Sequence, residues 1–370
     1  GTIESMQPWL RRNTYEIDNR YADKIILPGF IDPHTHLRYS GVYMGLNYVG
    51  PIDSASPTGL RKGLPTRDAV CNQLRSLVSE HDDSSKPLTA WGYDPAVQEG
   101  HLDRDMLDAI SDTIPLWVVA YAPHIIYVNS PMLELIGVDE DSIGHGLGRY
   151  PDGRLNGWFV ETEAIARATR PVADSVYADG SGSQAIERMG AVAQQAGLTT
   201  TADLGWGFSE SFEKEWADHR SAIDNDKFPL RILMIPFEAR LTRDFGDEAI
   251  NFLAGKRLEG DDRLTTHGIK YVNDGSYPSM TLVMNQPGYL DDDTAHTGEI
   301  PWENMVDRMR PFWKAGIQIH SHANGDRTVD MTLDTLAALQ LEHPRFDHRF
   351  TIEHYCLSNP SQAKRLAALG

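Results

Sequence analysis

The chain has 370 residues, of which 41% are hydrophobic and 24% are charged. This length suits one large α/β barrel or two ordinary domains, and no apolar run approaches the roughly 18 residues of a membrane helix. The net charge of −19 argues against nucleic acid and anionic membrane surfaces as partners, because both bind clustered Lys and Arg. A small-molecule substrate remains, and a homodimer is compatible with the sequence.

The two cysteines, Cys71 and Cys356, lie far apart and do not form the pattern of a disulfide framework. This favours a reducing, cytoplasmic location. The first residues show neither a signal-peptide pattern nor an initiator Met, so we expect the natural N-terminus to lie upstream.

In chain order, the first predicted element is a buried strand, Lys24–His36, bent at Pro28 and Gly29. Five later apolar runs resemble it, with helical patterns between most of them, which predicts a parallel sheet. Six strands with polar residues at their carboxyl ends favour a (β/α)8 TIM barrel that is incomplete in this chain. An open doubly wound sheet is the alternative, but the Gly-rich phosphate loop is missing. The later strands are Leu198–Leu204, Pro229–Phe237, Gly268–Asp274, Gly316–His322 and Arg349–His354, and the helices are Ser183–Ala196, Trp302–Ala315 and Thr328–Leu341.

About 160 residues separate the first two strands, far more than a βα connection needs. They contain their own predicted elements, so we expect residues 58–180 to form an inserted α+β subdomain over the mouth of a barrel built from 25–57 and 181–370. The charged segment Asp291–His296 is expected to be a solvated loop. The elements of the insertion are helices at Arg67–His81, Leu102–Ile114 and Pro131–Gly137, strands at Leu88–Tyr93 and Leu116–Tyr121, and a hairpin at Tyr150–Phe159.

His34 and His36 lie at the end of the first strand, in PGFIDPHTH. Residues two apart on a strand project to the same side, about 7 Å apart, where one ion can bind both. The alternative is a pair of packed histidines. His320 and His322 repeat the spacing in IHSHANGD, and His354 ends a further strand in FTIEHYC. Carboxyl ends of barrel strands meet on one face, so a shared metal site is favoured, with His320 as a supporting residue.

Lys270 lies inside the apolar strand GIKYVND, where a charged ammonium is costly. One explanation is an outward-pointing lysine or one paired with Asp274. The other is that burial favours the neutral amine, which can react with CO2 to give a carbamate able to bridge two metal ions.

PGFIDPHTHL at residues 28–37 resembles the first-strand motif of the metal-dependent amidohydrolase superfamily. Further stretches, in matching order over nearly the whole chain, are similar to its amidohydrolase family 3 (YtcJ-like) branch. These are LDAISDTIPLWVVAYAPHIIYVNS (107–130), PDGRLNGWFVE (151–161), GLTTTADLG (197–205), GIKYVNDGS (268–276), HANGD (322–326) and TIEHYCLSNP (351–360).

The resemblance implies a distorted TIM barrel beside a small β-sandwich, with residues 1–24 as a remnant of that sandwich. It also implies one or two metal ions, usually zinc, with iron or manganese as alternatives. Metal ligands and catalytic residues are expected among His34, His36, carboxylated Lys270, His322 and His354. His124, in HIIYVNS, is expected to face the substrate from the inserted subdomain. The aromatic residues Trp91 and Trp158 favour an apolar or aromatic group in that substrate.

The family also carries an aspartate at the end of the eighth strand, and Asp32, Asp203 and Asp274 do not match it. We therefore expect the chain to be part of a protein roughly 150–200 residues longer. Asp326 is predicted to cap the helix that follows it. The predicted activity is hydrolysis of a non-peptide C–N bond of a small molecule by metal-bound hydroxide. The alternatives are an ester or lactone hydrolase and a non-catalytic relative that binds a small ligand.

Overall fold

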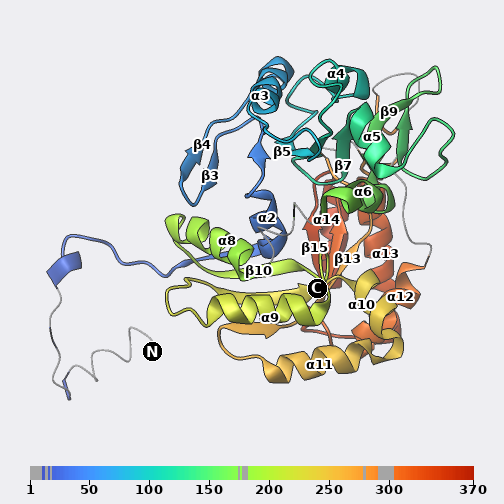
Figure 1. Ribbon diagram of the computed structural model, residues 1–370. Helices are drawn as coiled ribbons and strands as arrows, with labels where there is room; N and C mark the ends of the chain where they lie inside the picture. The colour runs from blue at the N-terminus through green and yellow to red at the C-terminus, as the bar shows by residue number, and fades with distance from the viewer. Residues whose placement is uncertain are drawn as a thin grey trace.

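Parallel strands follow one another in space in chain order and form the larger part of the computed structural model (Figure 1). The structure describes residues 11–12, 16, 19–173, 176, 182–277, 281–290 and 304–370. One sheet has the order β1-β10-β11-β12 and another the order β13-β14-β15. The strands are β1 (Phe30–Thr35), β10 (Leu198–Trp206), β11 (Arg231–Pro236), β12 (Leu264–Thr266), β13 (Ile269–Val272), β14 (Ile319–Ala323) and β15 (Thr351–His354).

The two sheets are one arc, interrupted at Gly268. Its φ of 99° lies in the left-handed region, where glycine has no side chain to clash, and this bend separates β12 from β13. A parallel bridge between Phe237 and Lys270 continues the pairing from the β11 side to β13. Among the described residues β1 and β15 do not pair, so the arc is not a closed barrel.

Helices cover the outer side of the arc and supply most of its core (Figure 1). Trp206, at the end of β10, packs against Phe212 and Trp216 of α9, with ring centroids 5.4 and 5.5 Å away. Because these rings are almost fully buried, they hold β10 against α9 mainly through the hydrophobic effect. The helices are α8 (Ser183–Gln195), α9 (Phe212–Ile223), α10 (Glu238–Phe245), α11 (Ala249–Glu259), α12 (Met305–Lys314), α13 (Asp326–Glu342) and α14 (Pro360–Leu369), with a 3-10 turn at Gly246–Glu248.

A second sheet, of order β2-β5-β6-β7-β9-β8, lies above the arc in Figure 1 and has its own apolar core. It mixes parallel and antiparallel pairs, as expected for an inserted unit joined by short turns. The strands are β2 (Asn47–Tyr48), β5 (Leu88–Tyr93), β6 (Leu116–Ala120), β7 (Ile125–Val128), β8 (Leu147–Arg149) and β9 (Leu155–Val160), beside the hairpin of β3 (Ser54–Ser56) and β4 (Gly59–Arg61). The helices are α2 (Leu37–Tyr43), α3 (Arg67–Ser79), α4 (Arg104–Asp108), α5 (Ser130–Ile136) and α6 (Glu161–Thr169), with 3-10 turns at Asn19–Tyr21 and Arg170–Val172.

The predicted mixed α/β architecture is confirmed at the level of its elements. Every predicted strand has a counterpart, and the hairpin turns at Asp152–Gly153 as expected. The first strand is shorter than predicted, because 24–29 form no strand and leave Ile25 and Ile26 88% and 80% exposed. The helix predicted at Leu102–Ile114 covers only Arg104–Asp108. The interruption that creates β12 was not predicted, nor were α9 to α11.

Several predictions lie partly or wholly outside the described residues. Of the expected β-sandwich remnant, 1–24, the structure describes 11, 12, 16 and 19–24, which contain a 3-10 turn and no strand. The charged loop Asp291–His296 is outside the described residues, as are the first residues of the helix predicted at Trp302–Ala315. The boundaries of the inserted subdomain stay a prediction.

Two smaller observations concern the thiols and membrane association. Cys71 and Cys356 are both free, as the absence of a disulfide pattern predicted. Within the described ranges, no helix combines the length and the apolarity needed to cross a membrane.

Close contact between α2 and α8 fixes the helix that begins directly after His36. A Cβ added at Gly41 would lie 1.9 Å from the carbonyl oxygen of Ala185, and this backbone atom cannot move aside easily. We therefore expect Gly41→Ala to lower the free energy of unfolding by about 1–3 kcal/mol, as overpacked core positions do. Urea denaturation followed by circular dichroism measures this change.

The matched control is Gly255→Ala in α11, where an added Cβ meets nothing within 4 Å. Alanine at that exposed helical position should raise the free energy of unfolding by about 0.5–1 kcal/mol. Equal effects of the two substitutions would contradict the proposed α2–α8 contact.

Candidate active site

Four histidines from three strand ends surround one space. The ring centroids of His34 and His36 are 5.5 Å apart, and those of His34 and His354 are 4.7 Å apart. His322 closes the group, with its ring centroid 4.5 Å from that of His354. Imidazoles that share a tetrahedral ion at an N–metal distance of about 2 Å have centroids roughly 5 Å apart. The structure thus brings together the four histidines that the sequence singled out.

The carboxylate of Glu353 joins two of these strand ends. One oxygen lies 2.5 Å from Nδ1 of His34, and the other lies 2.7 Å from Nδ1 of His320. Burial alone would raise the pKa of Glu353, but the hydrogen bonds from His320 and His34 lower it well below its usual range. Glu353 therefore stays ionised and leaves Nε2 of His34, which is buried and has no partner in the described part of the chain, free to bind an ion.

Lys270 is 1% exposed, and its Nζ has no hydrogen-bond partner among the described residues. It neither points outward nor pairs with Asp274, whose carboxylate instead accepts the backbone N–H groups of Asn324 and Gly325 at 3.0 and 2.8 Å. Burial lowers the pKa of Lys270 to about 7, although Glu353 opposes this shift. A substantial fraction of the amine is therefore neutral near pH 7, which is the form that reacts with CO2.

A buried polar chain lies behind His36. Burial, followed by the positive charge of Lys270, lowers the pKa of His36 to about 3, so the ring is neutral as a metal ligand must be. The nearby carboxylate of Asp203 lies 3.3 Å from Nε2 of His219, whose Nδ1 donates to the carbonyl of Glu215 at 2.7 Å. These contacts hold Asp203 in place beneath the histidine.

The inserted sheet contributes His124, which lies in the turn between β6 and β7. Its ring centroid is 6.1 Å from that of His322, so the structure places this residue beside the four histidines. Its contact with the substrate stays a prediction. Trp91 stacks on Tyr43 and Tyr121, with ring centroids 6.4 and 6.3 Å away. Trp158 instead packs on His101 at 4.4 Å and donates its Nε1–H to a backbone carbonyl inside the inserted unit. The structure shows no ring contact between either tryptophan and the four histidines, and substrate contact by these two residues stays a prediction.

The nitrogen atoms around this space are of the types that bind metal ions in proteins. Buried nitrogens without partners among the described residues include His34 Nε2, His36 Nδ1 and Lys270 Nζ. However, Nε2 of His322 lies 2.8 Å from the carbonyl of Gly275. In the described ranges, no three His, Cys, Asp or Glu side chains form a group that could hold a metal ion as they stand. The chemistry of the donor set therefore fits a metal ion.

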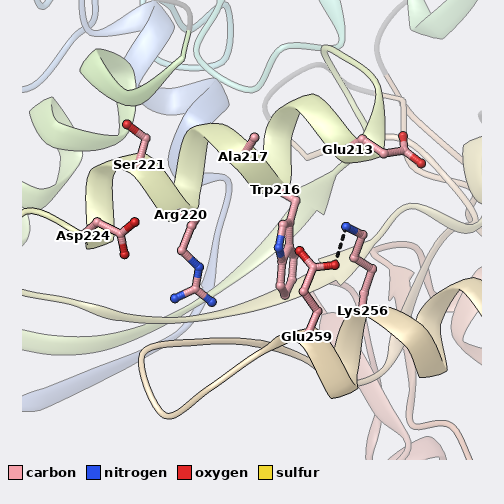
Figure 2. A pocket seen from close by; sticks show the side chains of 8 residues that line it. All are labelled: Glu213, Trp216, Ala217, Arg220, Ser221, Asp224, Lys256 and Glu259. Atoms are coloured by element: carbon pink, nitrogen blue, oxygen red, sulfur yellow. Dashed lines mark hydrogen bonds and ion pairs between the residues drawn. The ribbon is translucent and has the colours of Figure 1, made fainter.

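A separate depression of about 550 Å³ lies on the outer surface between α9 and α11 (Figure 2). Trp216 from α9 lines one side, and Lys256 and Glu259, an ion pair within α11 at 2.7 Å, line the other. None of the predicted site residues lines it, so it contributes nothing to the site formed by the histidines.

Sequence reasoning missed three carboxylates that organise the site or its neighbourhood: Glu353, Glu161 and Glu215. A signal existed for Glu353, because an acidic residue inside the buried run RFTIEH needs a partner, as Lys270 does. Asp326 was predicted to cap α13, and this prediction is wrong. The cap position is Gly325, and the Asp326 carboxylate accepts hydrogen bonds from Asn285.

A family model described as the amidohydrolase family matches residues 22–370. The chain therefore belongs to the amidohydrolase family, as its motifs predicted. The fold is similar to crystal structures of uncharacterized metal-dependent hydrolases from two archaea. That from Pyrococcus horikoshii OT3 has a TM-score of 0.58 at 18% identity, over 92% of this chain and 61% of that one. That from Pyrococcus furiosus has a TM-score of 0.57 at 18% identity, over 95% and 66%.

Three named relatives are 22–26% identical to the chain. Protein LONG AFTER FAR-RED 3 of Arabidopsis thaliana is 26% identical over 100% of this chain and 61% of its own length. Exoenzymes regulatory protein AepA of Pectobacterium carotovorum subsp. carotovorum is 22% identical over 100% and 76%. N-substituted formamide deformylase of Arthrobacter pascens is 22% identical over 94% and 62%. The chain thus spans less than two thirds of the first of these relatives.

Burial of Lys270 predicts how the stability of the metal-free, CO2-free protein depends on pH. Folding lowers its pKa from 10.5 to about 7, so between these values the unfolded chain holds a proton that the folded chain lacks. The free energy of unfolding should therefore rise with pH in this window, by at most about 1.4 kcal/mol per pH unit. Below about pH 7 both states are protonated and this dependence ends.

Urea denaturation of the wild type and of Lys270→Met at several pH values between about 7 and 10 measures this effect. The difference between the two proteins should change with pH, whereas the exposed control Lys227→Met should follow the wild type. Parallel curves for the wild type and Lys270→Met would show that Lys270 is not held neutral by burial.

Proposed function

We propose that the protein hydrolyses the C–N bond of a non-peptide amide in a small molecule. The observation that carries this proposal is the meeting of His34, His36, His322 and His354 around one space, beside the buried amine of Lys270. Membership of the amidohydrolase family supports it. So does the relative from Arthrobacter pascens, whose name states a C–N hydrolase activity on N-substituted formamides.

The four histidines and carboxylated Lys270 would hold one or two metal ions, for which zinc is our first choice. When bound, such an ion supplies hydroxide near neutral pH and polarises the substrate carbonyl. Glu353 keeps His34 and His320 oriented, because both of its oxygens are engaged by their Nδ1 atoms. The inserted sheet restricts access from above and brings His124 to the substrate.

Two other functions remain as candidates. An ester or lactone hydrolase would use the same ligands, and only the substrate distinguishes it. A non-catalytic ligand-binding relative is favoured by one observation, the lack of a preassembled group of metal donors among the described residues. The relative AepA is named a regulatory protein, and such a name is compatible with a non-catalytic role for AepA itself.

Metal content and turnover together test the proposal. The full-length protein, purified without chelator, should contain about two equivalents of zinc by inductively coupled plasma mass spectrometry, and His34→Ala should lose most of it. His343→Ala, a substitution on the exposed end of α13, should keep the wild-type content. Formate release from a panel of N-substituted formamides should accompany the bound metal and disappear in His34→Ala.

Hydrolysis of p-nitrophenyl acetate and lactones without any amide turnover would favour the esterase alternative. Absence of bound metal after reconstitution with zinc, iron and manganese would refute the proposal and favour the ligand-binding alternative.

A carbamate on Lys270 gives a separate expectation. Protein reconstituted with zinc in 13C-bicarbonate should show an enriched carbamate carbon by NMR. Lys270→Ala should lose that signal and about one of two metal equivalents, because the bridging anion is gone. Lys227→Ala, at an exposed loop position, should change neither quantity. A single metal equivalent in the wild type, without a carbamate signal, would make Lys270 an ordinary buried lysine.

A further inference from the structure

Glu161 adopts a backbone conformation that residues with a Cβ atom avoid. Its φ is 64°, in the left-handed region, at the point where β9 ends and α6 begins. Such a conformation persists in a non-glycine residue only where surrounding contacts enforce it, and it is enriched at functional sites. The contacts of Glu161 identify what enforces it.

Both the backbone and the side chain of Glu161 form hydrogen bonds with one residue, His124. Its N–H donates to the carbonyl oxygen of His124 at 2.9 Å. Its carboxylate lies 3.0 and 3.3 Å from Nδ1 of the same histidine. The Thr281 hydroxyl also hydrogen-bonds to this carboxylate. Burial would raise the pKa of Glu161, but the hydrogen bond from His124 outweighs this effect and the pKa is lowered. The carboxylate is therefore ionised and accepts a hydrogen bond from Nδ1 of His124.

This pairing decides which nitrogen of His124 is presented to the site. Because an ionised carboxylate can only accept, Nδ1 carries the hydrogen and the neutral ring has its lone pair on Nε2. No other residue in the described ranges hydrogen-bonds to Nε2, and the side chain of His124 is 20% exposed. The ring lies 6.1 Å from that of His322, at the edge of the four histidines.

We propose that Glu161 is a positioning residue that fixes His124 in the Nδ1–H form, and that Nε2 of His124 accepts a hydrogen bond from the N–H of the substrate amide. The inference rests on the proposed function and narrows its substrate class. A lone pair at this place requires a donor, and the only donor in a simple amide bond is its N–H. The site is therefore built for amides of primary amines, and discriminates against N,N-disubstituted amides and esters, which lack that hydrogen.

Two measurements on the metal-loaded, full-length protein test this. The first is long-range 1H–15N NMR of 15N-histidine-labelled protein, in which the His124 signals are those missing from His124→Asn. We expect the Nδ1–H form in the wild type and its loss in Glu161→Gly. Glycine adopts the left-handed conformation freely, so this variant removes the carboxylate and keeps the backbone bond to His124. An Nε2–H form in the wild type would overturn the inference.

The second measurement compares N-butylformamide, N-butyl-N-methylformamide and butyl formate. The wild type should prefer the first over the second by about tenfold or more in kcat/KM, since a site that hydrogen-bonds a substrate N–H rejects an analogue that lacks this group. Glu161→Gly and His124→Asn should remove this preference, because kcat/KM for N-butylformamide should fall by about tenfold or more relative to that for N-butyl-N-methylformamide and butyl formate. Glu163→Ala, an exposed change on α6, should behave as the wild type.

An equal loss on all three compounds would mean that the pair supports the fold only, and it would overturn the inference. If the wild type hydrolyses none of them, the proposed function fails. The tautomer of His124 is measured without turnover, so it still decides whether Glu161 positions this ring.

Discussion

The candidate site depends on one buried carboxylate. Glu353, on β15, accepts hydrogen bonds from His34 on β1 and from His320 on β14, and its charge faces the amine of Lys270. No strand pairing joins β1 to β15 in the described part of the chain, so this carboxylate is the polar link between the two ends of the arc. Removing it would leave two imidazoles without their shared acceptor and Lys270 without a nearby opposite charge, at a cost typical of buried polar groups that lose a partner.

The same carboxylate explains why the site could be predicted only in part. Residues that end parallel strands meet on one face whatever their separation in the chain, so the positions of His34, His322 and His354 followed from local patterns alone. The strands themselves were predictable because each is a short apolar run with turn residues at its ends. The acidic residue inside RFTIEH indicates that Glu353 needs a partner, but that partner, His34, lies 319 positions away and no spacing rule connects the two.

The errors in the fold have equally specific causes. Apolarity predicted a strand from Lys24, but Ile25 and Ile26 pair with no strand among the described residues and are exposed there. Asp326 has the right residue type for a helix cap, yet its carboxylate accepts a hydrogen bond from the backbone N–H of Asn285, which lies in a distant loop. The interruption between β12 and β13 reflects the φ of Gly268, and nothing in the residues around it distinguishes this glycine from one in an ordinary turn. In each case a tertiary contact or a single torsion decided the outcome.

Backbone strain gathers around the histidines. Apart from glycines, five described residues have positive φ, and three of them are Glu161, His354 and Tyr355. His354 and Tyr355 end the last strand of the arc, whereas Glu161 begins a helix of the inserted unit, so the strain lies on both sides of the site. Such conformations are disfavoured individually and are kept where packing over-determines them. The four histidines and Lys270 therefore define the chemistry on one side, and the His124–Glu161 pair approaches from a separately folded sheet on the other. For the proposed amide hydrolase, this separation would let the histidine site stay constant while changes in the inserted sheet alter which amides are accepted.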